Sequence, residues 1–264
     1  MKKILVYFLI SASMISGIQA QTATPWQGKK CAVVITYDDA IDQHLDNAVP
    51  LLDSLGLKAT FYVTAFSTSM QRRMGEWKKL AENGHELGNH TLFHPCQGGA
   101  GREWVRQEYD LRNYTVQRIV DEARMTNLFL RLLDGKTKRT YAYTCGDMKI
   151  GDSLFIGPLK NDFVAARGVT SRLNTLGQTN LWNVDCYGVN GESGTQLIGW
   201  AKKAMETKSL LVVLFHGVGG GNGLDVSLPA HREFLQFLKQ HESEIWIAPM
   251  VTVAEYIQTR QSGN

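Results

Sequence analysis

Two histidines, His90 and His94, stand four residues apart in the segment HELGNHTLFHP, which covers residues 85–95. One helical turn aligns side chains at this spacing, and Pro95 requires His94 to lie near the end of any such turn. Two imidazoles aligned in this way can bind one metal ion. Ordinary polar residues near a turn are the alternative interpretation, so the pair needs a third ligand to indicate a site.

Acidic residues and another histidine follow two further apolar runs. Asp38 and Asp39 end the run 31–39, and His216 follows six apolar residues in 210–217. Successive side chains of a strand alternate faces, so the two acids can have different roles. One Asp and two His leave coordination positions open, as in catalytic zinc sites. A histidine whose pKa lies near neutral pH can protonate a leaving group when a neighbour such as a carboxylate sets its tautomer. A turn, a helix cap or a core histidine are the structural alternatives.

Strand-like and helical patterns alternate along the chain. Predicted strands are 31–39, 59–65, 139–146, 162–168, 179–185, 210–217 and 245–249, with 85–90 as a short strand or the loop leaving one. Predicted helices are about 45–55, 74–84, 103–133, 195–207 and 231–241, with a closing helix after 249. This alternation predicts an α/β fold with a parallel sheet, and about seven repeats favour a closed or nearly closed barrel over an open sheet. The carboxyl ends of its strands would gather the acids and histidines on one face.

The first twenty residues have the features of a secretory signal peptide: Lys2 and Lys3, an apolar run, and a small-residue ending before Gln21. We therefore predict a signal peptide at 1–20, a single domain at 21–264, and export to the periplasm or the extracellular space. Without the two lysines the formal net charge falls from +3 to about +1, which does not suggest a nucleic-acid partner. No later run reaches about 18 apolar residues, so no transmembrane segment is expected.

The four cysteines permit three disulfide connectivities in an exported protein, and the sequence does not choose among them. Their number is too small for a disulfide scaffold, and a C-x-x-C zinc pattern is missing from the sequence. Cys31 lies in an apolar run and is expected to be buried. The other three are Cys96, Cys145 and Cys186.

Three motifs together resemble those of a known family. TYDDA at 36–40, HTLFH at 90–94 and LFHG at 214–217 occur in this order. The chain is similar over roughly 30–258 to the polysaccharide deacetylases of carbohydrate esterase family four, the chitooligosaccharide deacetylase-like homology domain. The resemblance implies a distorted (β/α) barrel of about seven strands, a divalent metal ion, and removal of acetyl groups from an acetylated oligo- or polysaccharide.

The motifs also imply residue roles. Asp38 would be the catalytic base and His216 the general acid, with Asp185 as its candidate partner. Zinc would be the expected metal ion, with Co, Ni or Mn as alternatives for an oxygen and two-nitrogen ligand set. The metal ligands would be Asp39, His90 and His94, and the candidate substrate-binding residues are Tyr143, Trp182 and Tyr187, for which core packing is the alternative.

Two positions depart from the family pattern. The first motif normally has Gly after the two acids, and this chain has Ala40. The third motif usually supplies an Arg that steadies the base, and the similar segment TYAYTCGD has Ala142 there. Arg139 or Arg167 could substitute for it.

The leading hypothesis is therefore a secreted, metal-dependent carbohydrate deacetylase. An O-acetyl esterase acting on a plant polysaccharide such as acetylxylan is one alternative, and a catalytically impaired carbohydrate-binding protein, favoured by the missing Arg, is another. A serine esterase is disfavoured because NGESG around Ser193 does not match G-x-S-x-G. GVGGGNG at 217–223 lacks the ending of a phosphate loop and is interpreted as a bend after His216.

Overall fold

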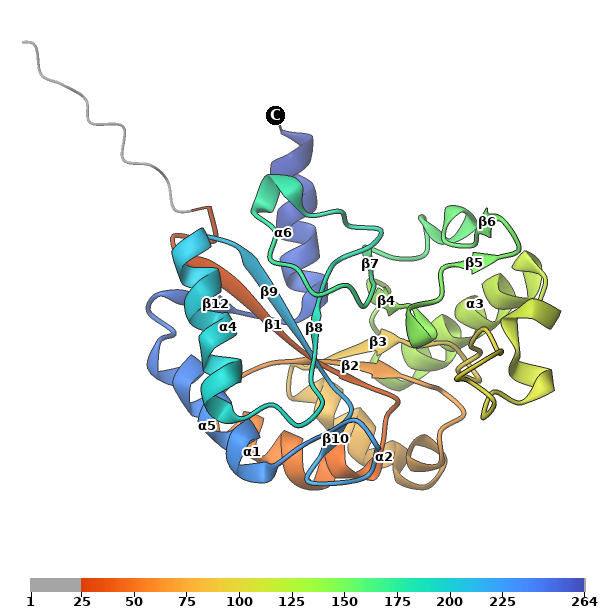
Figure 1. The fold of residues 1–264 in the computed structure, drawn as a ribbon, viewed down its shortest axis with the longest axis horizontal. Coiled ribbons are helices and arrows are strands. Elements are labelled where there is room, and N and C mark those ends of the chain that lie inside the picture. Colours follow the sequence, from red (N-terminus) through yellow and green to blue (C-terminus); the bar gives the residue numbers. More distant parts are fainter. Residues whose placement is uncertain (1–24, 264) are drawn as a thin grey trace, which may run out of the picture.

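The computed structural model describes residues 25–263, so the predicted signal peptide lies outside the described residues. Eight strands form the main sheet: β1 Cys31–Asp38, β2 Thr60–Val63, β3 Glu86–Asn89, β4 Thr140–Ala142, β7 Ala165–Arg167, β8 Tyr187–Gly188, β9 Leu210–Phe215 and β12 Ile245–Ile247. They pair in parallel in the order β7-β4-β3-β2-β1-β9-β8, and β12 also pairs with β1. Figure 1 shows the helices arranged around these strands.

The remaining elements are helices and short pairs of strands. The helices are α1 Val49–Leu55, α2 Thr68–Glu82, α3 Val116–Asp134, α4 Gly194–Thr207, α5 Leu228–Gln240 and α6 Met250–Ser262. The short strands are β5 Lys149–Ile150, β6 Ser153–Leu154, β10 Gly217–Val218 and β11 Asp225–Val226. Within the described residues, every helix is too short or too polar to cross a membrane.

One segment brings the two ends of the sheet together. Val184 forms a parallel bridge with Arg167 at the end of β7, and its N–H donates to the carbonyl of Ala166 over 2.9 Å. Three residues later, Tyr187 pairs with Val213 of β9. The segment therefore contacts both sheet edges, and the predicted distorted (β/α) barrel of about seven strands is confirmed.

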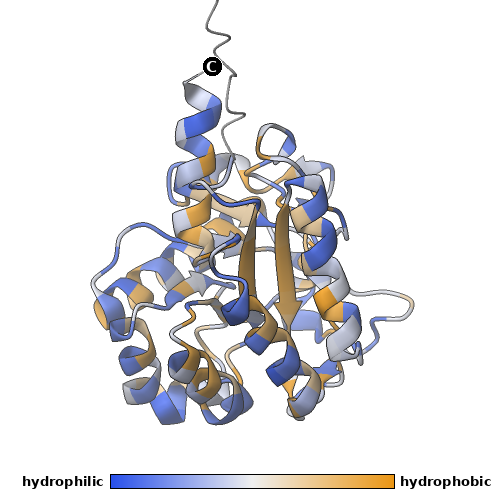
Figure 2. Ribbon diagram, turned by 90° about the vertical axis from the view of Figure 1, so that its left-hand side faces the viewer, coloured by the Kyte–Doolittle hydropathy of each residue, from blue (hydrophilic) through white to orange (hydrophobic). Residues whose placement is uncertain are grey.

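Burial on both faces of the sheet explains why the central strands are continuous apolar runs in the sequence. All eight residues of β1 are buried, because other strands flank it and helices cover it. Figure 2 shows hydrophobic residues concentrated in the central strands and hydrophilic residues on the outer helices. Ser193 is the N-cap of helix α4, and its hydroxyl accepts the N–H of Gln196 over 3.3 Å. This serine is a helix cap, which accounts for it without an esterase role.

Several predicted bounds differ from the structure, and two predicted elements differ most. The helix predicted over 103–133 begins only at Val116, because the preceding residues form two short 3-10 turns and Thr115 caps the helix. Asp110 stabilises the non-helical backbone there by accepting the N–H groups of Gly98 and Arg112. The predicted strand 179–185 is mostly turn, and only its end, at Val184, pairs with the sheet.

Candidate metal centre and active site

The register of the parallel strands brings the sequence motifs to one edge of the barrel. Tyr37 of β1 pairs with Phe215 of β9, so Asp38 lies beside His216. On the other side of β1, strand β2 intervenes before β3, which ends one residue before His90. All these residues follow the carboxyl ends of their strands, where barrel proteins place their active sites.

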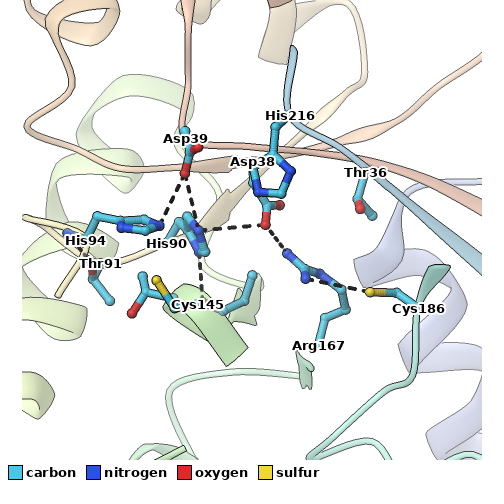
Figure 3. A network of polar contacts seen from close by, with 12 residues as sticks. Thr36, Asp38, Asp39, His90, Thr91, His94, Cys145, Arg167, Cys186 and His216 are labelled. Carbon is cyan, nitrogen blue, oxygen red and sulfur yellow. Dashed lines mark hydrogen bonds and ion pairs between the residues drawn. The ribbon is translucent and has the colours of Figure 1, made fainter. Parts of the chain in front are cut away.

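Asp39, His90 and His94 converge on one point (Figure 3). The Oδ1 atom of Asp39 lies 3.3 Å from Nε2 of His94 and 3.6 Å from Nε2 of His90. This oxygen is buried and has no hydrogen-bond partner among the described residues. An orphaned carboxylate oxygen facing two imidazole nitrogens fits a divalent cation such as Zn²⁺, whose protein ligands are of these types.

The two histidines lie in a loop, so the helical turn predicted from their spacing is wrong. Thr91 and His94 both have left-handed backbone conformations, with φ of 65° and 57°. Side chains hold the loop in this shape: Asn89 Oδ1 accepts the N–H of Thr91 over 2.8 Å, and Thr91 Oγ1 accepts the N–H of His94 over 2.9 Å. The loop therefore aligns the ligands by side-chain capping, which the spacing alone does not reveal.

His90 is held in the form that a metal ligand needs. Its Nδ1 lies 2.9 Å from the carbonyl oxygen of Ala142, so Nδ1 carries the proton and Nε2 presents its lone pair towards Asp39. Burial lowers the pKa of His90 to about 4, although the charges of Asp38 and Asp39 oppose this shift. The imidazole is therefore neutral at pH 7. Ala142, which occupies the place of the expected Arg, contributes through its backbone.

A disulfide borders this loop. Cys96 and Cys145 are joined, and Cys96 Sγ lies 3.6 Å from Nδ1 of His94. The bond ties the loop after β3 to the turn after β4, and Cys145 also lines the cavity described below. Cys31 and Cys186 are buried free thiols. The burial of Cys31 confirms the prediction from its apolar run.

Asp38 lies beside the metal-ligand cluster but has a different partner. Its Oδ2 pairs with the guanidinium of Arg167 and lies 3.7 Å from Nε2 of His90. Its Oδ1 is buried without a partner among the described residues and is free to accept a proton. Burial raises the pKa of Asp38, but the charges of Arg167, His90 and His216 and the hydrogen bond from Arg167 outweigh burial and hold this pKa below its usual value. Asp38 is therefore a carboxylate at neutral pH.

Arg167, from β7, is the cation that steadies Asp38. Its side chain is fully buried, and it donates to the carbonyl of Gly168 over 2.9 Å while lying 5.1 Å from the ring centroid of Tyr62. It also contacts Cys186 Sγ at 3.8 Å. The family pattern places this Arg in β4, at the position of Ala142. Here the cation comes instead from β7, the strand next to β4 in the sheet.

The other proposed substitute, Arg139, lies elsewhere. Arg139 directly precedes β4. Its guanidinium forms an ion pair with Asp134, with an Nη2 to Oδ1 distance of 2.7 Å. It also donates to the carbonyl of Leu87 over 2.7 Å. Arg139 is thus a buried structural residue at the amino ends of the strands, and only Arg167 reaches the base.

His216 follows β9 and its ring turns towards Asp38 (Figure 3). Its carbonyl accepts a hydrogen bond from Nε2 of the buried His44 over 2.7 Å, which fixes the backbone at this point. Its Nδ1 has no hydrogen-bond partner among the described residues. The ring thus lies next to Asp38 with a nitrogen that could take part in proton transfer.

Asp185 does not partner His216, which corrects the prediction from sequence. Its Oδ2 accepts a hydrogen bond from Asn174 over 2.8 Å and lies 3.9 Å from Nε of Arg172. The next residue, Cys186, points inward, so alternation along this extended segment turns Asp185 away from the barrel centre.

Two of the three predicted sugar-binding aromatics are packing residues. Trp182 packs against the cluster that contains Tyr143, and Lys160 lies 5.5 Å from its ring. Tyr187 packs against Trp200, with ring centroids 4.9 Å apart and ring planes tilted by 42°. Tyr143 does line the cavity, although it is buried and its hydroxyl donates to the carbonyl of Trp182 over 2.8 Å.

A cavity of about 730 Å³ opens over the site and contains Asp38, Asp39, both loop histidines and His216 in its walls. Sequence reasoning missed its most prominent aromatic residue, Trp104, which lines the cavity while 62% of it remains exposed. Exposed apolar surface beside polar groups is typical of a binding site. The apolar walls comprise Trp104, Tyr143, Val169, Val189, Leu214 and Leu224.

Ala40 occupies a backbone conformation that favours glycine. Asp39 and Ala40 have φ of 81° and 53°, so the family's usual Gly matches the local geometry. We expect Ala40→Gly to raise the free energy of unfolding by about 1 kcal/mol, since a non-glycine residue in this region is strained. Urea unfolding of the metal-free protein measures the change. Lys208, with φ of 53°, is a matched control at which a Gly should also stabilise. Stabilisation at Lys208 but not at Ala40 would contradict this interpretation.

The barrel and the residues at its carboxyl edge define a (β/α)-barrel protein with a candidate metal site at the carboxyl ends of its strands. The family model for polysaccharide deacetylases matches residues 27–151, which confirms the family predicted from the motifs. Residues 27–151 thus belong to the polysaccharide deacetylase family. His216 lies beyond the matched residues, and the strand register brings it to the same edge.

Solved structures share the fold over most of the chain. A polysaccharide deacetylase-family protein from Pseudomonas aeruginosa PAO1 has a TM-score of 0.63 and 11% identity, covering 95% of this chain and 98% of that one. The polysaccharide deacetylase Bc1974 from Bacillus cereus has a TM-score of 0.52 and 15% identity, covering 83% and 91%. The Puue allantoinase has a TM-score of 0.61 and 11% identity, covering 96% and 98%. Proteins with different names share this fold, so substrate must be argued from the site.

A curated relative, a gellan lyase from a Bacillus species, is 21% identical over 93% of this chain. The chain spans only 10% of the length of that protein. The likeness therefore concerns one part of a much larger molecule.

Proposed function

We propose that this protein is an exported, divalent-metal-dependent deacetylase that removes acetyl groups from a carbohydrate. The observation that carries the proposal is the orphaned Oδ1 of Asp39, which faces Nε2 of His90 and of His94 within 3.6 Å. A separate carboxylate, Asp38, lies beside this cluster with its own cation. Ligand and base are therefore two different acids, so a metal ion that activates water and a base that accepts its proton can act side by side.

Asp39, His90 and His94 would hold the cation, with Zn²⁺ as the leading choice and Co²⁺, Ni²⁺ or Mn²⁺ as alternatives. When bound, it would polarise the acetyl carbonyl and lower the pKa of the attacking water. Asp38 would accept the proton of that water on its unpartnered Oδ1, because Arg167 keeps the carboxylate charged through Oδ2.

His216 would return a proton to the departing group. Its ring lies beside Asp38 (Figure 3) and both side chains line the cavity, so the base and the acid can serve the same acetyl group. An amine leaving group needs this proton more than an alcohol does. N-acetyl sugars, such as those of chitin and peptidoglycan, and O-acetyl polysaccharides, such as acetylxylan, are both candidate substrates. A panel of both kinds of substrate distinguishes them.

A catalytically impaired binding protein loses its main support. That hypothesis depended on the missing third-motif Arg, and Arg167 supplies a guanidinium to Asp38 from β7. The acid, base and candidate ligands are all present at one edge.

Export is supported by two independent features. Residues 1–20 have the pattern of a secretory signal peptide, and the Cys96–Cys145 disulfide is of the kind that persists in oxidising compartments. The proposed location is the periplasm or the extracellular space.

Acetate release tests the proposed function. The purified protein is stripped of metal with a chelator and incubated with acetylated xylan, chitin oligosaccharides and peptidoglycan, with and without added Zn²⁺, Co²⁺, Ni²⁺ or Mn²⁺. We expect release that disappears on chelation and returns with metal, and the responding substrate identifies the class. Release that is indifferent to metal, or no release from any substrate, would overturn the proposal.

Trp104 provides a prediction about the carbohydrate. An exposed indole at the rim of a cavity can stack on a sugar ring, and aromatic contacts of this size contribute about 0.5–1.5 kcal/mol. We expect Trp104→Ala to raise KM for an acetylated oligosaccharide by about twofold to tenfold, without changing turnover of a small aryl acetate. Leu154→Ala is the control, since Leu154 is 52% exposed on β6 but does not line the cavity. Equal losses on both substrates would argue against stacking.

A further inference from the structure

The glycine-rich segment after His216 is an ordered loop at the site rather than only a bend. Its first strand, β10, pairs with β11, and Gly217 donates its N–H to the carbonyl of Leu224 over 2.9 Å. Gly220 donates its N–H to Oδ1 of Asp225 over 2.9 Å. The loop is therefore fastened at both ends, and its tip is held in a defined position beside the cavity.

Asn222, at this tip, contacts a proposed metal ligand. Its Nδ2 donates to Oδ2 of Asp39 over 3.2 Å. Its Oδ1 accepts the N–H of Leu224 over 2.9 Å, and this bond fixes which end of the amide faces Asp39. Oδ2 of Asp39 is thus occupied, while Oδ1 remains directed at the two histidine nitrogens.

We propose that Asn222 is a positioning residue that sets the affinity and geometry of the metal centre by holding Asp39 as a one-oxygen ligand. This inference rests on the metal centre of the proposed function and deepens it. A carboxylate with a free second oxygen can rotate or bind an ion through both oxygens. The amide donor prevents this by engaging Oδ2, as partners of metal-bound carboxylates commonly do.

The glycines explain how the loop comes so close to Asp39. Gly221 has φ of 89°, and a Cβ there would lie 2.1 Å from Oε1 of Gln43. A Cβ on Gly217 would lie 2.7 Å from the backbone oxygen of Gly220. Larger residues at these positions would displace the tip, and with it the amide of Asn222. The close approach of the loop to Asp39 therefore accounts for the glycines of GVGGGNG, a segment that does not match a phosphate-binding loop.

The test measures metal binding directly. Dissociation constants for Zn²⁺ and Co²⁺ are determined by chelator competition on the metal-free wild-type protein and on Asn222→Ala and Asn222→Leu. The first variant removes the amide, and the second keeps a similar volume without a donor. Asn190→Ala is the matched control, because Asn190 lines the same cavity without a hydrogen bond to Asp39. We expect both Asn222 variants to bind about 10- to 100-fold more weakly, and the control to bind as wild type does.

A second readout separates positioning from general loosening of the loop. The visible ligand-field band of bound Co²⁺ reports coordination number, so it should change in both Asn222 variants and stay unchanged in Asn190→Ala. Wild-type affinity and an unchanged Co²⁺ spectrum in the Asn222 variants would overturn this inference while leaving the metal centre intact. Failure of the wild-type protein itself to bind metal would instead overturn the proposed function and, with it, this inference.

Discussion

Replacement of Asp38 by Asn should reduce acetate release by about 10²- to 10⁴-fold while leaving metal affinity near that of the wild type. The amide has nearly the same shape as the carboxylate but cannot accept a proton from water. Asp38 binds Arg167 through Oδ2, whereas the candidate metal ligand is the neighbouring Asp39. Acetate release and metal dissociation constants, measured on the same preparations, check both parts of this expectation.

Asp39→Ala and His90→Ala are the comparison variants, because both remove a proposed ligand. They should lose metal affinity as well as activity. Equal loss of metal in all three variants would contradict the division of roles between the two adjacent acids. Full activity of Asp38→Asn would remove Asp38 from the mechanism.

Arg167→Met should lower the free energy of unfolding at neutral pH by about 3–5 kcal/mol, the usual effect of removing one partner of a buried ion pair. Met fills a similar volume but leaves Asp38, which is 3% exposed, without its cation. Unfolding by urea, measured on metal-free protein, gives the change directly. The variant should also lose acetate release at neutral pH, because the base no longer remains charged.

The loss of stability in Arg167→Met should depend on pH with a definite sign. In the wild type the pKa of Asp38 is depressed, so its ionisation adds stability above the ordinary carboxyl pKa, and this stability disappears as the pH falls through the lower folded-state value. Without Arg167, burial raises the pKa and penalises the charged form. The deficit of Arg167→Met should therefore be largest near pH 7 and shrink towards pH 4. A deficit that is constant over this range would contradict the pairing.

Arg139→Met is the matched control for Arg167→Met. Arg139 is 1% exposed and is paired with Asp134 at a distance from the site. Its loss should destabilise the protein, because it also leaves a buried carboxylate unpaired, but the pH profile of acetate release should not move. The two variants together separate the stability of the barrel from the state of the base.

The positions of the acids and of three histidines could be predicted because parallel strands end at one edge. Asp38, Asp39, His90, His94 and His216 each follow a strand-like run, and the rule about carboxyl ends then suffices to gather them. The strand order and register that place them side by side were not needed for this inference.

The remaining parts of the site depend on contacts between distant segments. Arg167 reaches Asp38 only because β7 lies beside β4 in the sheet, and Asn222 reaches Asp39 only because glycines let its loop approach. Trp104 belongs to a segment that was predicted to be helical. No local pattern carries this information, since pairing partners are 129 or more residues apart for Arg167 and Asp38 and for Asn222 and Asp39.

The wrong assignments share one physical cause. Asp185, Trp182 and Tyr187 were placed at the site because they lie in, or just after, a segment predicted as a strand. That segment is mostly turn, so the side chains do not point where a regular strand would direct them. Packing against Trp200 and bonding to Asn174 then determine their surroundings.

The disulfide beside His94 has a consequence for how the protein is produced. If it is made in a reducing cytoplasm, Cys96 and Cys145 remain thiols, and their sulfur atoms lie within 4.8 Å of a ligand nitrogen of His94. Soft ions such as Cu⁺ and Zn²⁺ favour thiolates, so this trio would compete with Asp39 and His90 for His94. Metal content and activity would then depend on the oxidation history of the preparation. Thiol titration should accompany every metal analysis of this protein.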